Sequence, residues 1–117
     1  MRGAKNNIKI VPLNIVDYLT PRAIAYWFMD DGGADRSGVI LYTNGFTLAE
    51  VQRLVDALNS RYGLSCTIHK RIQNGQLRYM IYVGAKSWQI LKPIIEPFII
   101  PNFQYKLILR GSYKKNS

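Results

Sequence analysis

The sequence predicts a single α+β domain in which helices alternate with antiparallel strands. Its length of 117 residues suits one domain, and 48% of the residues are apolar, enough for a modest core. Two segments begin with helix-capping residues and end at glycine, and an Asn-Gly pair separates two strand-like runs. We divide the chain into a basic N-terminal extension (1–18), one domain (19–110) and a basic C-terminal tail (111–117).

The first predicted helix follows an extended segment that ends near Tyr18. Thr20 suits the N-cap and Pro21 the first helical position, because proline there loses no needed N–H. The run 23–29 (AIAYWFM) is apolar on every side, and Gly32 and Gly33 end the helix. A helix that is apolar all round must be buried all round. We expect one side to meet the core and the other to meet another subunit or domain.

Three more segments have clear patterns. Residues 37–44 are predicted to form a strand, and Thr47 with Glu50 forms a capping box for a helix that stops at Gly63. Phe46 and Val51 are placed to form a hydrophobic staple across that cap. A third helix is expected over residues 87–96, interrupted near Pro93. The residues predicted to face inward are Val39, Leu41, Thr43, Leu48, Val51, Leu54, Val55, Leu58, Trp88, Leu91 and Ile95.

Residues 64–83 are predicted to form a hairpin about Asn74-Gly75, a strong two-residue turn signal. The core face then pairs Ile72 with Leu77, Lys70 with Tyr79, Ile68 with Ile81 and Cys66 with Val83. The other face pairs Arg71 with Arg78, His69 with Met80 and Thr67 with Tyr82. Two opposed arginines repel each other. Either they face the phosphates and base edges of a nucleic acid, or they splay into water.

The positive charge is concentrated in the second half of the chain. Residues 1–60 hold six basic and six acidic side chains, whereas residues 61–117 hold ten basic side chains and Glu96 as the one acid. Such a surface suits a polyanion, although a solvated basic face is an equal interpretation on charge alone. Cys66 is the one cysteine, which excludes an internal disulfide and a cysteine-based zinc site. We expect no secretory signal, no transmembrane helix and no membrane partner.

Asp30 and Asp31 stand at the end of the first predicted helix. Carboxylates at a helix C-terminus are disfavoured by roughly 0.3–1 kcal/mol each. A bound cation would explain them, and oxygen ligands suit Mg²⁺, which usually takes one or two protein carboxylates. The plainer alternative is a polar Asp-Gly turn after a core helix.

Residues Ile24 to Gly32 resemble the LAGLIDADG motif, and the wider string from Leu19 to Gly33 looks like the second motif of I-SceI-type homing endonucleases. The likeness continues through most of the chain. It implies an α-β-β-α-β-β-α fold whose saddle-shaped antiparallel sheet faces DNA, and makes residues 19–110 a single LAGLIDADG domain. It also implies that two motif helices pack together and bind divalent metal at their shared base.

The resemblance also assigns site residues. Asp31 matches the catalytic, metal-binding aspartate, Gly32 lines the metal site, and Lys106 matches a catalytic lysine. Supporting roles fall to Asp30, Asn44 and Lys9, although Lys9 is equally well explained as part of a solvated basic tail. The expected cofactor is Mg²⁺, which Ca²⁺ or Mn²⁺ can replace in the site. The residues expected to contact DNA are Arg36, Ile40, Tyr42, Thr67, His69, Arg71, Arg78, Met80, Tyr82 and Arg110.

One motif supplies half of a cleavage site. We therefore expect a site-specific double-stranded DNA endonuclease of the intron-homing kind, active as a homodimer or with a separate first-half protein. Lys9 near the start favours the second half of a two-motif layout. The alternative is a non-cleaving protein of the same fold, such as a maturase that binds intron RNA. A ribosomal-type RNA-binding domain is disfavoured by the apolar helix that ends in Asp-Asp. The compartment is open; relatives of this kind are intracellular, and many are products of organellar introns.

Overall fold

The computed structural model describes residues 11–43 and 45–103, which fold into one α+β domain. The elements in chain order are η1 (Ile15–Tyr18), α2 (Pro21–Asp31), β1 (Gly32–Asp35), β2 (Gly38–Tyr42), α3 (Leu48–Tyr62), β3 (Thr67–Gln73), β4 (Gln76–Val83), α4 (Ala85–Ile95) and η2 (Glu96–Phe98). From α2 to α4 this is the predicted α-β-β-α-β-β-α order.

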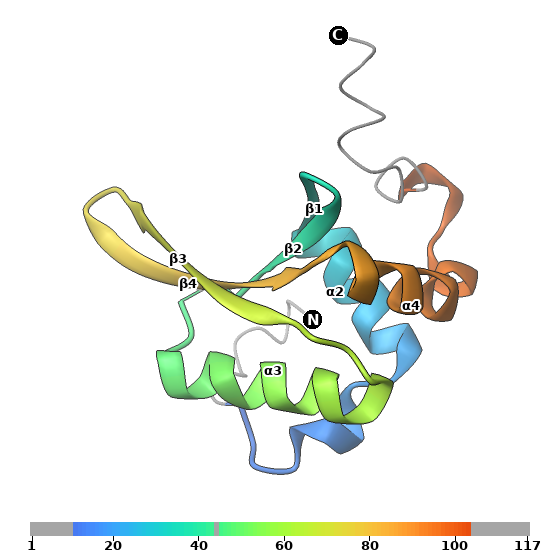
Figure 1. The fold of residues 1–117 in the computed structure, drawn as a ribbon, viewed down its shortest axis with the longest axis horizontal. Coiled ribbons are helices and arrows are strands. Elements are labelled where there is room, and N and C mark those ends of the chain that lie inside the picture. Colours follow the sequence, from blue (N-terminus) through green and yellow to red (C-terminus); the bar gives the residue numbers. More distant parts are fainter. Residues whose placement is uncertain (1–10, 44, 104–117) are drawn as a thin grey trace, which may run out of the picture.

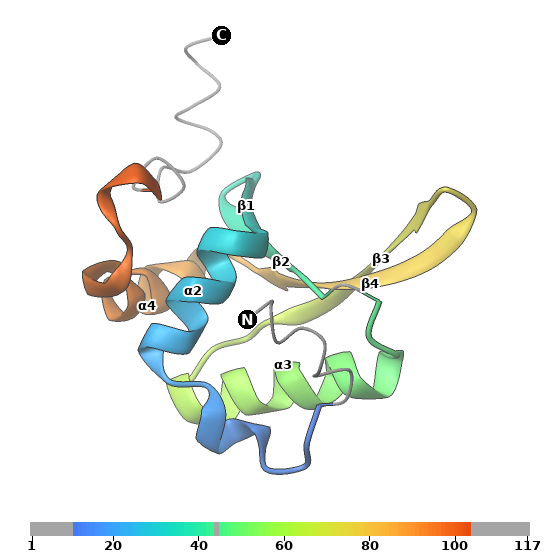
Figure 2. The same ribbon diagram turned by 180° about the vertical axis from the view of Figure 1, so that it is seen from behind.

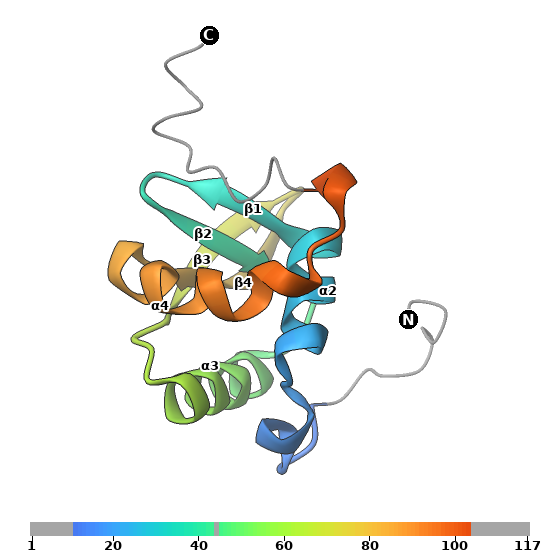
Figure 3. The ribbon, with the colours of Figure 1, turned by 90° about the vertical axis from the view of Figure 1, so that its right-hand side faces the viewer.

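The four strands form one antiparallel sheet in the order β1-β2-β4-β3. The sheet is strongly curved, and α2, α3 and α4 lie against one of its faces (Figures 1 and 2). Figure 3 shows the same layers from the side, with the sheet above the three helices. The opposite face, called the outer face below, is covered by no helix or strand of the described chain. The distal half of the β3–β4 hairpin projects past the helices.

The hydrophobic core lies between the sheet and the helices. Phe28 of α2 packs against Trp88 of α4 with ring centroids 5.3 Å apart. The strands contribute the predicted alternate positions, which pack into the same buried cluster. Those buried strand residues are Val39, Leu41, Ile81 and Val83. The predicted inward residues of α4, Trp88, Leu91 and Ile95, are also buried.

Helix α2 forms as its end signals predict. The Ala23 N–H donates a hydrogen bond of 3.1 Å to Thr20 Oγ1, and Pro21 is the first helical residue. One side, which includes Ile24 and Phe28, is buried, whereas Tyr26 on the other side is 49% exposed. We expected α2 to be buried on every side, but within the described chain only one of its sides is buried.

Helix α3 begins at the predicted capping box, with Thr47 and Glu50 each bonding the other's backbone N–H. It ends at Gly63, whose φ of 69° is left-handed and therefore favours glycine. Phe46 packs partly buried against the core that includes Val51, in line with the expected staple. Leu48, expected to face inward, is instead 46% exposed because it lies in the first turn.

Several expected boundaries and connections were wrong. The pattern analysis missed β1, because Gly32 and Gly33 read only as the end of a helix, yet this strand pairs with β2. Residues 15–18, expected to be extended, form the 3-10 helix η1, in which the Ile15 N–H donates to the Pro12 carbonyl. Helix α4 begins at Ala85 and continues through Pro93. Pro93 has no N–H to donate within this helix, so the helix continues through it with one backbone hydrogen bond fewer.

The hairpin has the predicted register, from Thr67 opposite Tyr82 to Gln73 opposite Gln76. Asn74 and Gly75 both have positive φ, as this two-residue turn requires. The predicted pairing of Cys66 with Val83 was wrong, because β3 begins one residue later. The Cys66 N–H and carbonyl bond the side-chain amide of Asn59 in α3 instead.

Only part of the hairpin face that was predicted to join the core is buried. Ile68 packs against the buried cluster and Ile81 is fully buried, but Ile72 and Leu77 near the tip are 66% and 49% exposed. The reason is that no helix lies beneath the tip (Figure 1). Among the described residues, no helix has the length and hydropathy needed to cross a membrane.

Candidate metal centre and nucleic-acid interface

The carboxylates of Asp30 and Asp31 are held at the C-terminal end of α2, where the helix runs directly into β1. The Gly32 N–H donates to the Phe28 carbonyl, which closes the last helical turn. A Cβ at Gly32 would overlap Phe28 Cδ1 and lie 2.7 Å from the Phe28 carbonyl oxygen. Glycine is therefore required here by close packing, since its φ of −102° suits any residue.

The end of α2 offers oxygen atoms that could act as metal ligands. Asp30 is exposed and Asp31 is half-buried, and the last carbonyl groups of α2 add partial negative charge. No group of three His, Cys, Asp or Glu side chains suited to a metal occurs in residues 11–43 and 45–103. The set therefore does not fit an all-protein metal cage. It does fit Mg²⁺, which keeps several waters and binds through one or two carboxylates.

Beside the carboxylates, the open side of α2 carries a shallow pocket of about 260 Å³. Tyr26, Met29 and Asp30 line it from the helix, and Ile100 and Phe103 from the segment after η2. Tyr26 and Ile100 are about half exposed, at 49% and 48%. The sequence predicted that this side of the apolar helix would pack against a second subunit or domain. The pocket offers an apolar surface for such a contact, and the contact itself remains a prediction.

The outer face of the sheet collects the side chains that the sequence assigned to nucleic acid. The pairing register brings Ile40, Tyr42, Thr67, His69, Arg71, Arg78, Met80 and Tyr82 onto this one face. Ile40 and Met80 are nevertheless buried, at 3% and 2% exposed. The accessible surface is therefore made by the aromatic, polar and basic members of the set.

Two of these side chains, His69 and Tyr82, lie together with Arg36 of the β1–β2 turn. The Tyr82 ring is stacked on His69 of β3, with centroids 4.7 Å apart, and the Arg36 guanidinium lies 5.6 Å from the Tyr82 centroid. Because β3 and β2 flank β4 on opposite sides, Tyr82 lies between its two partners. Arg36 has a φ of 57°, an unusual conformation for a residue with a side chain, and pairs with Asp35 at 3.7 Å. The Arg36 side chain is 70% exposed, so this cation lies over the Tyr82 ring on the side that faces solvent.

Trp27 links the helix that bears the carboxylates to this sheet. Its indole N–H donates a hydrogen bond of 2.9 Å to the Tyr42 carbonyl at the end of β2. Trp27 belongs to the apolar run 23–29 that the sequence predicts to be buried, and it is in fact partly buried against the core. The bond fixes the end of α2 relative to the strand beside it, and no local sequence pattern signals such a contact.

The cysteine takes no part in this surface. Cys66 is 4% exposed, and burial raises the pKa of its thiol to about 12. A thiol with so high a pKa stays protonated near neutral pH, so it is neither a nucleophile nor a metal ligand. This agrees with the core position expected for it.

The remaining predicted site residues, Lys9, Asn44, Lys106 and Arg110, lie outside the residues that the structure describes. Their roles stay predictions. Conversely, the sequence analysis overlooked Gln76, which bonds Arg78 Nη2 at 3.0 Å. Its alternation with Arg78 on one strand face was the signal that could have identified it.

A sequence model of the LAGLIDADG DNA endonuclease family matches residues 3–91 of the chain. The chain belongs to this family. It is 41% identical over 111 residues to the cytochrome b mRNA maturase bI2 of Saccharomyces cerevisiae, covering 95% of this chain and 25% of that protein. It is 38% identical over 104 residues to the intron-encoded endonuclease ai4 of Dictyostelium discoideum, covering 88% and 64%.

Among solved structures, the chain resembles the homing endonuclease I-WcaI bound to its DNA recognition sequence. The TM-score is 0.77 at 34% identity, over 90% of this chain and 48% of that chain. This match supports the LAGLIDADG fold seen here, including the antiparallel sheet. The chain thus spans only about a quarter to two thirds of the relatives named here. Their names include both endonucleases and a maturase.

Proposed function

We propose that this LAGLIDADG chain is one half of a site-specific double-stranded DNA endonuclease that hydrolyses phosphodiester bonds with divalent metal. The observation that carries the proposal is the position of Asp30 and Asp31 at the end of α2, where the chain passes directly into β1, the edge strand of the sheet. The outer face of the same sheet carries basic and aromatic side chains. The resemblance to intron-encoded endonucleases and to a DNA-bound homing endonuclease supports it.

Asp31, with oxygen atoms near Gly32, would hold Mg²⁺, and Asp30 would support it. When bound there, the metal would stabilise negative charge on the attacked phosphate and lower the pKa of a bound water. The chain's own contribution is to fix the carboxylate, because Gly32 is packed against Phe28 and α2 is anchored in the core. Lys106 is proposed to offset charge on the attacked phosphate.

The described residues of one chain, 11–43 and 45–103, offer too few ligands for the whole reaction. A second LAGLIDADG half, either another copy or a separate first-half protein, would pack on the open side of α2 around Tyr26. Burying this half-exposed aromatic side chain and its apolar neighbours would favour the association. Two identical halves would require a roughly palindromic target.

The outer face of the sheet is proposed to lie on the DNA. The major groove admits antiparallel strands, and arginine, histidine and tyrosine can contact base edges and phosphates there. The ten positive charges of residues 61–117 would favour binding through the release of counterions.

A second function has specific support. The identity of 41% to a cytochrome b mRNA maturase favours a role in intron RNA splicing. Splicing assistance by binding alone would not need the carboxylate of Asp31, so the two functions make different demands on this residue.

The decisive experiment compares Asp31→Asn with the parent and with Asp30→Asn as a matched control. Each protein, with and without a first-half partner, is incubated with Mg²⁺ and DNA containing the intron-insertion site. We expect Asp31→Asn to bind this DNA but to cut it about 100-fold more slowly or worse, because metal stabilisation is worth several kcal/mol. Asp30→Asn should retain most cleavage. Equal cutting by Asp31→Asn and the parent would contradict the proposal.

A further inference from the structure

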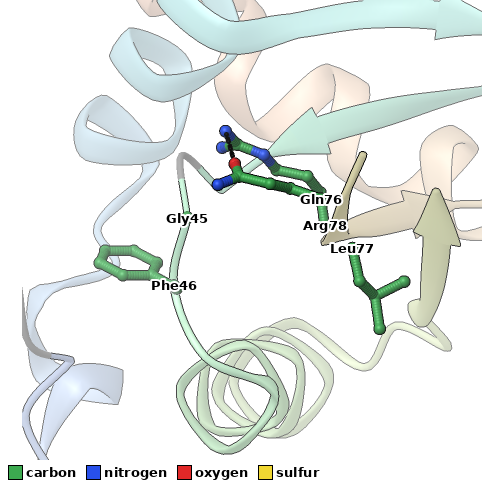
Figure 4. A pocket seen from close by; sticks show the side chains of 5 residues that line it. All are labelled: Gly45, Phe46, Gln76, Leu77 and Arg78. Atoms are coloured by element: carbon green, nitrogen blue, oxygen red, sulfur yellow. Dashed lines mark hydrogen bonds between the residues drawn. The ribbon is translucent and has the colours of Figure 1, made fainter. Parts of the chain in front are cut away.

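The two arginines that oppose each other across the hairpin differ in their surroundings. Arg71 and Arg78 are directly paired on the outer face. Arg71 is exposed and makes no side-chain hydrogen bond to another described residue. Arg78 is half-buried and its guanidinium is turned toward the loop that follows β2 (Figure 4). One charge is therefore free to move, and the other is held.

The difference arises from where β2 leaves the sheet. The β2–β4 pairing stops at Tyr42 opposite Met80, so the part of β4 nearer the tip extends beyond its neighbour. The loop through Gly45 and Phe46 runs beside this part of β4. Between loop and strand is a pocket of about 410 Å³, lined by Gly45, Phe46, Gln76, Leu77 and Arg78. Figure 4 shows Gln76 and Arg78 lying together on the side toward Gly45, with Leu77 pointing away.

Arg78 is held by specific contacts in this pocket. Its Nη2 donates a hydrogen bond of 3.0 Å to Gln76 Oε1. Its Nε is shielded from solvent and has no hydrogen-bond partner in the described structure. Its Nη1 lies 3.8 Å from where a Cβ at Gly45 would be, and Gly45 has a φ of +87° that disfavours any side chain. The loop therefore leaves space beside the guanidinium.

These contacts favour one kind of ligand. Bidentate recognition of guanine needs two free donors on one edge of the guanidinium. The edge made by Nε and Nη2 is shielded at one donor and occupied at the other, and on the remaining edge, made by Nη1 and Nη2, the Nη2 group already donates to Gln76. A phosphate makes no such demand, because one anionic oxygen can accept from any remaining N–H.

We propose that the Arg78 pocket binds a backbone phosphate of the DNA, whereas Arg71, directly opposite, contacts base edges. Gln76 is a positioning residue, which holds the guanidinium toward the loop. The proposal rests on the proposed DNA-binding function and adds a division of roles between two arginines that look equivalent in the sequence.

The test uses a DNA duplex selected by the parent protein from a random-sequence pool. Arg78→Ala and Arg71→Ala are compared after circular dichroism shows that both fold. For Arg78→Ala we expect weaker binding to every duplex by a similar factor and a salt dependence lower by about one released counterion per bound copy. The base preferences should not change. Arg71→Ala should instead flatten the preference at one base pair by about 5-fold or more.

Two conservative variants sharpen the result. Arg78→Lys should keep most of the affinity, because lysine binds phosphate as a point charge, whereas Arg71→Lys should still lose base preference. Gln76→Ala should weaken binding to all duplexes without changing base preference, since it frees Arg78 to adopt other conformations. A loss of preference at one base pair in Gln76→Ala would contradict its role.

A chemical substitution in the DNA locates the contact. Single phosphates of the selected duplex are replaced by uncharged methylphosphonates, and each position that weakens binding of the parent is noted. One of these positions should lose its effect in Arg78→Ala and keep it in Arg71→Ala. If every position keeps its effect in Arg78→Ala while one base preference disappears, Arg78 contacts a base and the inference is wrong. If the parent binds no duplex in a salt-dependent way, the proposed function itself fails.

Discussion

The end of α2 and the tip of the β3–β4 hairpin both carry charged groups, but they are held in different ways. At the end of α2, Phe28 is 1% exposed and its ring packs at a tilt against Trp88, and Gly32 leaves no room for a side chain. At the hairpin tip, Ile72 and Leu77 are mostly or half exposed, and the strands are held chiefly by their own pairing. Asp30 and Asp31 are therefore carried by a helix that packs on the core, whereas Arg71 and Arg78 lie on strands that project past the core.

This difference matches two physical requirements. Metal-assisted chemistry needs its ligands held closely in place, which a buried helix provides. Contact with a long, irregular ligand surface needs reach, and strands with little buried apolar area can adjust at small cost. The hairpin provides both a fixed and an adjustable group, because Arg78 is bonded to Gln76 in its pocket while Arg71 is exposed.

The largest test of the comparison is a pair of truncations. Phe28→Ala should lower the free energy of unfolding by about 3–5 kcal/mol, because it leaves a cavity beneath the carboxylates. Leu77→Ala, at the half-exposed tip, should change it by about 0.5 kcal/mol or less. Denaturation in urea measures both, and similar losses would show that the tip is part of the core.

Two adjacent glycines sharpen the comparison at the end of α2. Gly32→Ala should cost about 1–3 kcal/mol, because its Cβ would overlap Phe28. Gly33→Ala is the control, since its Cβ would meet nothing within 4 Å. Thermal unfolding of both variants compares them. A stable Gly32→Ala variant would mean that the helix end can shift, contrary to the rigid position proposed for the carboxylates.

A smaller effect is expected within the outer face. In a double-mutant cycle, Arg36→Ala and Tyr82→Leu should show a coupling of about 0.5–1 kcal/mol in the free energy of unfolding, from the cation over the ring. Arg71→Ala combined with Tyr82→Leu is the control, and these two should be additive. If only the control pair showed a coupling energy, the cation that interacts with the Tyr82 ring would be Arg71 at the hairpin tip and not Arg36.

The smallest effect concerns Glu50 in the cap of α3, away from both regions. The backbone hydrogen bond from Thr47 lowers the pKa of the Glu50 carboxyl below its ordinary value of 4.5. A lowered pKa stabilises the fold above that ordinary value, and the contribution is lost as pH falls through the lower, folded-state pKa. Glu50→Gln should therefore be less stable than the parent at pH 7 and should approach it under acid. A constant difference across this pH range would contradict the linkage.

Local chemistry explains why much of the fold could be predicted from the sequence. The cap at Thr20, the capping box at Thr47 and the turn at Asn74-Gly75 each depend on neighbouring residues alone. The turn then sets the register of the whole hairpin, including the opposed arginines. β1 was missed because Gly32 and Gly33 have no side chains to form an alternating pattern, and its pairing with β2 is what makes it a strand.

The candidate site was predicted in part. Family resemblance singled out Asp31 and Gly32, and alternation collected the outer-face residues on one side of the sheet. The burial of Ile40 and Met80 on that face, the bond from Trp27 and the pairing of Gln76 with Arg78 were not foreseen. These features depend on how strands and loops pack against each other. That packing leaves no recognisable pattern among residues that are neighbours in the sequence.

Short-range sequence features are enough to specify where α2 and α3 begin, how the hairpin pairs, and that two carboxylates end an apolar helix. These features depend on hydrogen bonds and side-chain alternation within short segments. Tertiary structure alone decided which side of α2 stays open, where the core stops beneath the hairpin, and why Arg78 is held while Arg71 is free. Burial and access depend on segments distant in the chain, and only the packed arrangement brings these together.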